Sequence, residues 1–420
     1  MQNQTVSSLG ERALIARITA RLAMPSWVIV GPGDDAAVIK PERGALDVLT
    51  TDGLIDGVHF DTRFVPPDAI GHRALAVNLS DLAAMGAEPR AALLSLAIPE
   101  ATGVAFVDQL LDGLLALATR HRVTLIGGNI TRTPGPLSID VTAIGSVRPR
   151  RILTRSGARP GDAVYVTGTL GEAAAGLRAL QGGDAGYERG RARYLRPEPR
   201  VRAGLLLGRN RAASSCMDLS DGLADGVRQI AEASGAGITL DVDAIPIAED
   251  LRRWHHARGG APLETALTGG DDYELLFTVR SPHRGRFRGV RREFGDLPVT
   301  QIGVVTRNRE LLLKDHIRRP LRVHFVFTFE IYQIKCGRDQ VQTGQQFFAI
   351  LTFHNILDHA IGQTGRSRIE NRINGSVARG IDFIPTLQPH QPDTGIGLRV
   401  EIQQQHAHAS PSETGCCIYD

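Results

Sequence analysis

Lysine is nearly absent from this sequence: it occurs at Lys40, Lys314 and Lys335, and every other basic residue apart from histidine is arginine. A P-loop enzyme requires the lysine of GxxxxGK[ST], and a protein kinase requires a strand lysine that contacts the ATP phosphates. Lys40 follows Ile39 instead of the glycine that a P-loop requires. Both nucleotide-binding classes are therefore excluded. A phosphate-binding protein of this composition would rely on metal ions, arginines and backbone N–H groups.

Cysteine and long apolar runs are also scarce. The four cysteines show neither a disulfide framework nor metal-ligand spacing, which favours a reducing cytoplasm. The first residues lack a basic segment followed by an apolar one, and no stretch approaches 18 apolar residues, so we expect no signal peptide and no membrane span. A net charge of +3 over 420 residues gives no reason to expect a nucleic-acid or membrane partner.

What the sequence does contain is an alternating pattern of short apolar runs and amphipathic segments, typical of an α/β protein of more than one domain. We expect a first domain over residues 1–150 and a second over 151–320. A capping box at Ser8–Glu11 predicts the first helix. Further helices are expected at 68–85, 106–118 and 223–234, strands at 27–30, 46–49, 92–98, 123–126, 137–147, 163–166, 238–242, 274–279 and 299–305, and a surface loop at 182–199.

The chain changes character after about residue 320, where glutamine, histidine and phenylalanine become frequent and alanine becomes rare. Residues 321–420 show no sustained helical or strand periodicity. We interpret this segment as an appended tail that carries no functional signal.

Acidic residues gather in five short motifs: Gly33-Asp34-Asp35, Thr50-Thr51-Asp52, Leu79-Ser80-Asp81, Asp218-Leu219-Ser220-Asp221 and Gly269-Gly270-Asp271-Asp272. Most follow a predicted strand, and in α/β sheets the carboxyl ends of strands are where ligands bind. For any single motif, ordinary turn or N-cap chemistry is the competing explanation. The recurrence in five similar settings favours a shared site.

Bringing such carboxylates together has an electrostatic cost. Two like charges 4 Å apart repel by roughly 4 kcal/mol at an effective dielectric constant of 20. Bound cations remove this cost, and oxygen ligands with few histidines or cysteines select magnesium or calcium over zinc. Magnesium commonly bridges protein carboxylates to substrate phosphates, which indicates nucleotide chemistry.

Seven strings occur in one order, and together they resemble the thiamine-monophosphate kinase family, within the superfamily of aminoimidazole ribonucleotide synthetase. The resemblance runs from about residue 9 to about residue 305. The strings are GPGDDAAV, TTDGLIDGVHF, ALAVNLSDLAAMGAEP, LIGGN, LTRSGARPGDAVYVTGTLG, MDLSDGLADG and LTGGDDYELLFTV. The resemblance implies a two-domain aminoimidazole ribonucleotide synthetase-like α/β (α+β) fold, with mixed sheets flanked by helices. It also implies a homodimer assembled through the first domain.

The resemblance further implies a phosphotransferase that uses ATP, with several Mg²⁺ ions, to convert thiamine monophosphate to thiamine diphosphate. His59 and Asp271 match positions that approach thiamine monophosphate, and Asp52 and Asp221 are the expected catalytic residues. The ATP-binding positions are matched by Gly128, Asn129, Arg155 and Ser220. The magnesium positions are matched by Asp35, Thr50, Thr51, Asp52, Asp81, Asp218 and Asp221.

Two departures from the family stand out. Asn129 stands where the family often has an aspartate that binds metal, and asparagine keeps an oxygen donor but loses the charge. The family's C-terminal aromatic residue near the substrate has no counterpart that we can locate.

Two alternatives to this kinase remain open. One is another ATP-using member of the superfamily, such as aminoimidazole ribonucleotide synthetase or selenophosphate synthetase, although the N-terminus lacks the reactive Cys and Lys expected of the latter. The other is a nucleotide- or metal-binding relic without turnover.

Overall fold

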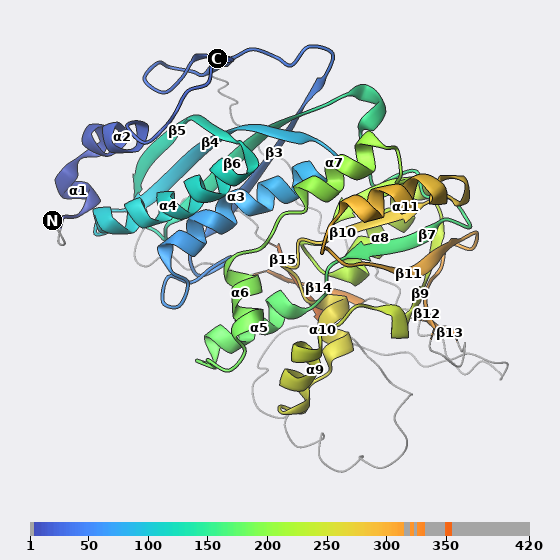
Figure 1. Cartoon of the computed structure of the whole chain (residues 1–420). Helices are drawn as coiled ribbons and strands as arrows, with labels where there is room; N and C mark the ends of the chain where they lie inside the picture. The colour runs from blue at the N-terminus through green and yellow to red at the C-terminus, as the bar shows by residue number, and fades with distance from the viewer. Residues whose placement is uncertain (1–3, 315–319, 323–325, 332–348, 355–420) are drawn as a thin grey trace, which may run out of the picture. The chain divides into compact units, whose positions relative to one another are not determined.

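The structure, a computed structural model, describes residues 4–314, 320–322, 326–331 and 349–354. Strands and helices alternate along these residues and build two larger sheets (Figure 1). Each of these sheets contains one parallel pair of strands among antiparallel pairs. The predicted α/β class, with mixed sheets flanked by helices, is confirmed.

The first larger sheet has the strand order β3-β6-β4-β5, and β4 and β5 form its parallel pair. Its strands are β3 (Leu46–Ile55), β4 (Glu88–Pro99), β5 (Thr124–Thr133) and β6 (Ser138–Val147). A separate two-stranded ribbon precedes it, formed by β1 (Val28–Val30) and β2 (Val38–Ile39). Both β3 and β5 are longer than predicted, so Asp52 and Gly128 lie inside strands and not at their ends.

Four helices accompany this sheet: α1 (Val6–Leu9), α2 (Glu11–Thr19), α3 (Pro67–Ala84) and α4 (Val104–His121). Helices α3 and α4 run side by side, and α3 contacts β3 and β6 (Figure 1). On another flank α3 contacts α7 (Val201–Arg209) and the strand β8 (Ser215–Asp218) of the second half. Because neighbours surround it, α3 is buried along most of its length. Polar groups on α3 must therefore find partners inside the protein.

The second larger sheet has the order β13-β12-β9-β11-β7-β10-β8. Its remaining strands are β7 (Ala163–Thr167), β9 (Gly237–Asp241), β10 (Leu275–Val279), β11 (Val299–Thr306), β12 (Leu311–Lys314) and β13 (Pro320–Arg322). Strand β10 is fully buried because both faces of the sheet are covered. Its neighbouring residues Leu276 and Phe277 belong to two different hydrophobic clusters, as expected for side chains that alternate between faces.

The other helices of the second half are α5 (Glu172–Gln181), α6 (Glu188–Leu195), α8 (Leu223–Ser234), α9 (Glu249–His256), α10 (Pro262–Thr268) and α11 (Arg284–Glu293). Short 3-10 turns are η1 (Pro149–Arg151), η2 (Val242–Ala244) and η3 (Ser281–His283). Helix α6 contradicts the predicted loop at 182–199. Its Arg189 and Arg193 form ion pairs with Glu172 and Glu274. These tertiary contacts stabilise a helix that the Gly- and Arg-rich sequence does not predict.

Strands β14 (Val326–Ile331) and β15 (Ala349–His354) pair antiparallel with each other. Apart from these strands and the end of β13, the predicted tail lies outside the described residues. The domain boundaries at 150 and 320 stay predictions. Within the described residues, no helix combines the length and the apolar character needed to cross a membrane.

Candidate active site

An acidic cluster, formed by Asp52, Asp81 and Asp218, lies where the two halves of the chain meet. Asp52 lies in the middle of β3, Asp81 lies near the end of α3, and Asp218 is the last residue of β8. The expectation that a carboxylate follows a strand end is therefore wrong for Asp52, whereas Asp81 lies in the helix that the sequence predicts over 68–85. Contacts of α3 with both β3 and β8 bring the three elements together instead.

Hydrogen bonds connect the cluster across these elements. The Thr50 hydroxyl donates to Asp81 Oδ2, and the Ser80 hydroxyl donates to Asp218 Oδ2 over 2.6 Å. Ser80 is fully buried and Asp218 nearly so. Ser80 of the first-half motif Leu79-Ser80-Asp81 thus binds Asp218, the first residue of the second-half motif Asp218-Leu219-Ser220-Asp221.

All three carboxylates of the cluster have a raised pKa, and burial is the largest cause in each case. Burial, followed by the nearby charge of Asp81, raises the pKa of Asp52 to about 6. Burial and the charges of Asp81 and Asp52 raise the pKa of Asp218 to about 7, against the bond from Ser80. Burial likewise raises the pKa of Asp81, although Thr50 and Arg155 act in the opposite direction. These shifts are what a crowded, partly desolvated group of negative charges produces.

Arg155 and Asp221 lie beside this cluster. The Arg155 guanidinium donates to Gln229 Oε1 over 2.6 Å, and its charge acts on both Asp81 and Asp221. Burial and the charges of Asp225 and Asp271 raise the pKa of Asp221. Ser220 is exposed in the same loop, and its carbonyl accepts the Asp271 N–H over 2.7 Å. The predicted residues Arg155, Ser220 and Asp221 are therefore neighbours of the acidic cluster.

A second group, the Arg73 cluster, contains His59, Arg73, Tyr194, Asp271 and Tyr273. The Arg73 guanidinium lies 3.0 Å from Asp271 Oδ1 and 4.3 Å from the centre of the Tyr194 ring. The Tyr273 hydroxyl donates to Asp271 over 3.1 Å, and the Tyr194 hydroxyl donates to the His59 carbonyl over 3.2 Å. Desolvation lowers the pKa of His59, while the charge of Asp271 acts to raise it. The predicted pair His59 and Asp271 is thus joined through side chains that the sequence did not single out.

Arg73 and Tyr194 are the residues that sequence reasoning missed. Arg73 is 2% exposed on a helix whose buried positions are mostly apolar, so a charged residue within that apolar pattern was the available signal. Tyr194 lay in the segment predicted to be a loop. No pattern in that segment indicated that its ring would face Arg73.

Other predicted residues lie apart from the acidic cluster. Asp35 is exposed in the loop between β1 and β2, where its N–H binds the Asp34 side chain over 3.0 Å. Thr51 points to the opposite face of β3 from Thr50 and Asp52, because side chains alternate along a strand. Its hydroxyl accepts a bond from Thr142 over 3.1 Å and donates to the Val141 carbonyl over 3.3 Å. The structure brings neither Asp35 nor Thr51 into contact with the cluster.

Gly128 lies in the same row across the sheet as Asp52, through Val141 and Leu94. Three strand spacings separate them, which corresponds to about 14 Å. A Cβ at Gly128 would lie 1.9 Å from the Leu94 carbonyl oxygen, so the position requires glycine. Asn129 is the next residue, and alternation turns its side chain to the face that Thr51 occupies.

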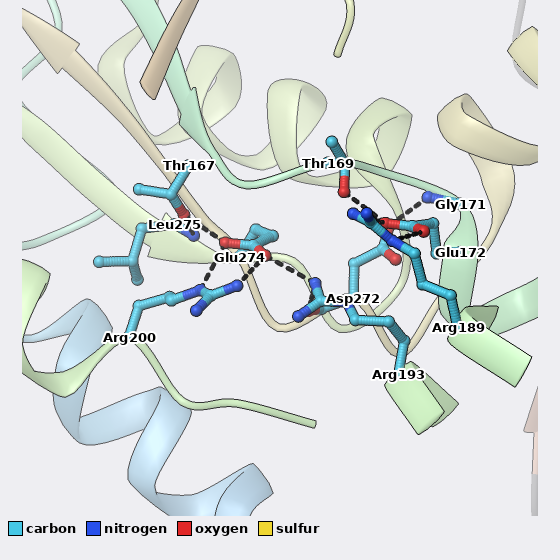
Figure 2. A network of polar contacts seen from close by, with 10 residues as sticks. All are labelled: Thr167, Thr169, Gly171, Glu172, Arg189, Arg193, Arg200, Asp272, Glu274 and Leu275. Atoms are coloured by element: carbon cyan, nitrogen blue, oxygen red, sulfur yellow. Dashed lines mark hydrogen bonds and ion pairs between the residues drawn. The ribbon is translucent and has the colours of Figure 1, made fainter. Parts of the chain in front are cut away.

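Behind the Arg73 cluster, a buried ionic network anchors the loop that carries Asp271 (Figure 2). Glu274 is fully buried and accepts bonds from Arg193 over 2.6 Å, from Thr167 over 2.6 Å and from Arg200 over 2.7 Å. Burial acts to raise the pKa of Glu274, but the two arginines outweigh it and the pKa lies below its usual value. Asp272 accepts the Gly171 N–H over 2.7 Å, and burial raises its pKa to about 8.

The oxygen donors of the acidic cluster fit a hard divalent cation, because carboxylate and hydroxyl oxygens are the ligands that magnesium prefers. A cation would also remove the repulsion that raises the pKa values of Asp52 and Asp218. Among the described residues, however, no group of three or more His, Cys, Asp or Glu is close enough to form a metal site by itself. Such an ion would need further oxygen donors from a ligand, as phosphate groups provide.

Comparison with known proteins identifies both halves. Residues 33–147 match the family model "AIR synthase related protein, N-terminal domain", and residues 159–315 match its C-terminal domain counterpart. The thiamine-monophosphate kinase of Salmonella typhimurium is 42% identical over 308 residues, which cover 72% of this chain and 92% of that protein.

Solved structures agree. The thiamine-monophosphate kinase of Stenotrophomonas maltophilia superposes with a TM-score of 0.65 at 40% identity, covering 71% of this chain and 95% of its own. A complex of AaThiL with AMPPCP and TMP superposes with a TM-score of 0.59 at 32% identity, covering 75% of this chain and 97% of its own.

Proposed function

This chain belongs to the thiamine-monophosphate kinase family, and we propose that it transfers the terminal phosphoryl group of ATP to thiamine monophosphate, giving thiamine diphosphate. It is then a phosphotransferase with a phosphate group as acceptor. The relatives at 42% and 40% identity carry this name, and a relative at 32% identity was solved with AMPPCP and TMP together. The hydrogenase maturation protein HypE also superposes, but at 18% identity, which shows a shared fold alone.

The observation that carries the proposal is the contact between the motifs Leu79-Ser80-Asp81 and Asp218-Leu219-Ser220-Asp221. The 2.6 Å bond from Ser80 to Asp218 holds one carboxylate from each half within a single site. Such a site is suited to cations that lie between two phosphorylated molecules, which would otherwise repel each other.

In this proposal, Mg²⁺ supplies charge neutralisation and alignment of the phosphates. Asp52, Asp81 and Asp218 are its central ligands, and Asp221 lies beside them. The proposed magnesium ligands are Asp35, Thr50, Thr51, Asp52, Asp81, Asp218 and Asp221. The roles of Asp35 and Thr51 rest on the family resemblance, because their side chains lie apart from the cluster.

The protein residues mainly bind and orient the two substrates. Gly128, Asn129, Arg155 and Ser220 are proposed to contact ATP, with the Arg155 guanidinium paired to a phosphate. His59 and Asp271 are proposed to hold thiamine monophosphate. The acceptor oxygen belongs to a phosphate that is already anionic, so none of these residues needs to act as a strong base. In-line transfer then depends on how firmly the acidic cluster and the Arg73 cluster keep the two substrates aligned.

Two further features are proposed, the first from the resemblance and the second from the scarcity of cysteine. The protein forms a homodimer through its first domain, and it acts in the cytoplasm. Sedimentation of the purified protein tests the first of these.

The decisive experiment incubates purified protein with ATP, Mg²⁺ and thiamine monophosphate and follows thiamine diphosphate by chromatography. Formation of thiamine diphosphate supports the kinase. Nucleotide binding without formation of product indicates instead a binding protein that has lost catalytic turnover. Turnover of ATP with another acceptor in place of thiamine monophosphate indicates a different activity of the superfamily.

A further inference from the structure

A separate cavity of about 200 Å³ lies away from the candidate active site. Its lining includes Arg150, Arg151, Arg211, Arg280, His283 and Ser214. None of its lining residues belongs to the acidic cluster or to the Arg73 cluster. Four arginine residues line this one cavity, and none of them has a role in the proposed phosphoryl transfer.

Three tight turns carry these arginines. Arg151 closes the η1 turn by donating to the Arg148 carbonyl over 2.8 Å. Arg211 follows α7, and its N–H binds the Gly208 carbonyl over 3.0 Å. The first two turns approach each other closely: a Cβ at Gly208 would lie 2.6 Å from the Arg151 carbonyl oxygen. The third turn joins Arg280 to His283 through a backbone bond of 2.8 Å. The cavity walls are therefore held by backbone contacts and are preorganised.

Two buried nitrogens at this cavity lack a partner among the described residues: Arg280 Nε and His283 Nδ1. One Arg280 Nη2 bond, to the Gly157 carbonyl over 3.0 Å, fixes the guanidinium and leaves Nε unused. A buried polar nitrogen without a partner costs free energy that a ligand would recover. The pair therefore points to an acceptor that occupies the cavity.

The charge of the cavity favours an anion. An acidic group does lie behind it, since Ser214 Oγ donates to Asp162 Oδ2 over 2.7 Å. That carboxylate is already engaged, because it also accepts the Arg159 N–H over 2.9 Å. One negative charge leaves the four arginines largely uncompensated.

We propose that this cavity binds a compact oxyanion of the phosphate or diphosphate class, gripped by the guanidinium groups of Arg150, Arg151, Arg211 and Arg280. Guanidinium forks match the oxygen geometry of phosphates and bind them with paired hydrogen bonds. A cavity of about 15 Å³ suffices for one water, so 200 Å³ admits a phosphate or a diphosphate group. The source is either an inorganic anion or the phosphorylated end of a metabolite.

Arg211 offers a sharp test because it adopts a left-handed backbone with φ of 50°. Glycine is favoured in that conformation, so Arg211→Gly removes a guanidinium without straining the fold. Arg122 is the matched control: it caps α4 in the same conformation with φ of 57° and does not line the cavity. Arg122→Gly makes the same chemical change elsewhere.

The probe is inorganic pyrophosphate, titrated by calorimetry with EDTA present and without nucleotide, so that metal-dependent binding at the acidic cluster is removed. We expect one site in the wild type and in Arg122→Gly. The affinity should fall about tenfold or more in Arg211→Gly, the loss expected for one charged hydrogen-bonding partner. Arg280→Gln, which retains a bond donor near Gly157, should weaken binding similarly.

Absence of binding to the wild type overturns the proposal, and so does equal binding by the wild type and Arg211→Gly. Parallel titrations with inorganic phosphate and thiamine diphosphate separate the sources. Thiamine diphosphate could also bind the candidate active site as the proposed product, so only the binding that Arg211→Gly loses is counted. Tighter binding of thiamine diphosphate than of pyrophosphate in that part assigns the site to a metabolite, and the reverse order assigns it to an inorganic anion. Turnover is not measured, so the outcome is independent of the proposed kinase activity.

Discussion

The Arg73 guanidinium, buried within α3, lies 3.0 Å from the Asp271 carboxylate, which is about a third exposed at 29%. Arg73 is buried away from water, whereas the Asp271 carboxylate is partly exposed at the candidate active site. Asp271 also holds a left-handed backbone with φ of 69°, which a non-glycine residue rarely adopts. The ion pair with Arg73 therefore holds the Asp271 side chain in place on a backbone conformation that is itself unfavourable.

Replacing Arg73 with methionine should raise the KM for thiamine monophosphate more than it lowers kcat. It should also lower the free energy of unfolding by about 2–4 kcal/mol, since it leaves Asp271 without its cation and the Tyr194 carbonyl without a donor. Steady-state kinetics and urea unfolding measure the two effects. The control is Arg63→Met, which removes an exposed pair with Asp61 and should cost less than about 1 kcal/mol. Unchanged KM in Arg73→Met would contradict the orienting role.

Asp52→Asn should lower kcat/KM by at least about 100-fold, because it removes a charge that the proposed cations require. Its fold should remain intact or become slightly more stable, since the substitution relieves repulsion from Asp81. The matched control is Asp47→Asn, an exposed aspartate on the same strand. Asp221→Asn should behave as Asp52→Asn does. Near-normal rates in both site variants at saturating Mg²⁺ would remove the proposed site.

Mg²⁺ together with a non-hydrolysable ATP analogue should raise the melting temperature, because ligands that bind only the native state stabilise it by about 2.7 kcal/mol at 100 times Kd. EDTA should abolish the shift. Asp81→Asn should reduce it strongly, while Asp47→Asn should keep it. Differential scanning fluorimetry at millimolar ligand reads out all four conditions.

Asp272 predicts a pH effect on stability. Burial raises its pKa from 3.8 in the unfolded chain to about 8, so the folded state holds the proton more tightly. The stability that this proton contributes is present below the unfolded pKa and is lost as the pH rises through about 8. Asp272→Asn mimics the protonated acid, so the variant should gain stability relative to wild type as the pH rises from 4 to 8. A pH-independent difference in unfolding free energy would contradict the raised pKa.

Glu274→Gln should destabilise the protein by about 3–5 kcal/mol, because Arg193 and Arg200 would lose their shared anion inside the protein. Urea unfolding measures the change. Glu198→Gln is the control, since its pair with Arg120 is exposed on both sides and contributes less than about 1 kcal/mol. Equal effects of the two substitutions would show that the buried network does not anchor the Asp271 loop.

The sequence predicts the long regular elements well, since their periodicity reflects one buried face. The helix expected at 68–85 and the strand expected at 137–147 match α3 and β6 closely. Other elements extend into polar residues, and for these the sequence predicts the ends incorrectly. Strand β3 continues through Thr50, Thr51 and Asp52 because β6 pairs with every one of them, and that partner is not visible locally. The first capping box is likewise displaced: Thr5 and Ser8 form it, and Gly10 precedes α2 without a side-chain cap.

The sequence motifs predicted which residues belong to the candidate active site better than they predicted how those residues are arranged. The acidic motifs indicated a shared site, and the bond between Ser80 and Asp218 joins the first-half motif to the second-half motif. The ring of Tyr194 over Arg73 depends on α6 packing against α3, a long-range contact that short sequence patterns do not encode.

Helix α3 carries Arg73 and Asp81 on one continuous rod, eight positions apart, which corresponds to about 12 Å along its axis. Because neighbours enclose this rod, it cannot bend or slide without disturbing both halves. The distance along α3 between Arg73, which orients Asp271, and Asp81 is consequently fixed. Insertions in the surrounding loops should leave that span unchanged, whereas adding or removing one residue inside α3 would rotate one end by about 100° relative to the other.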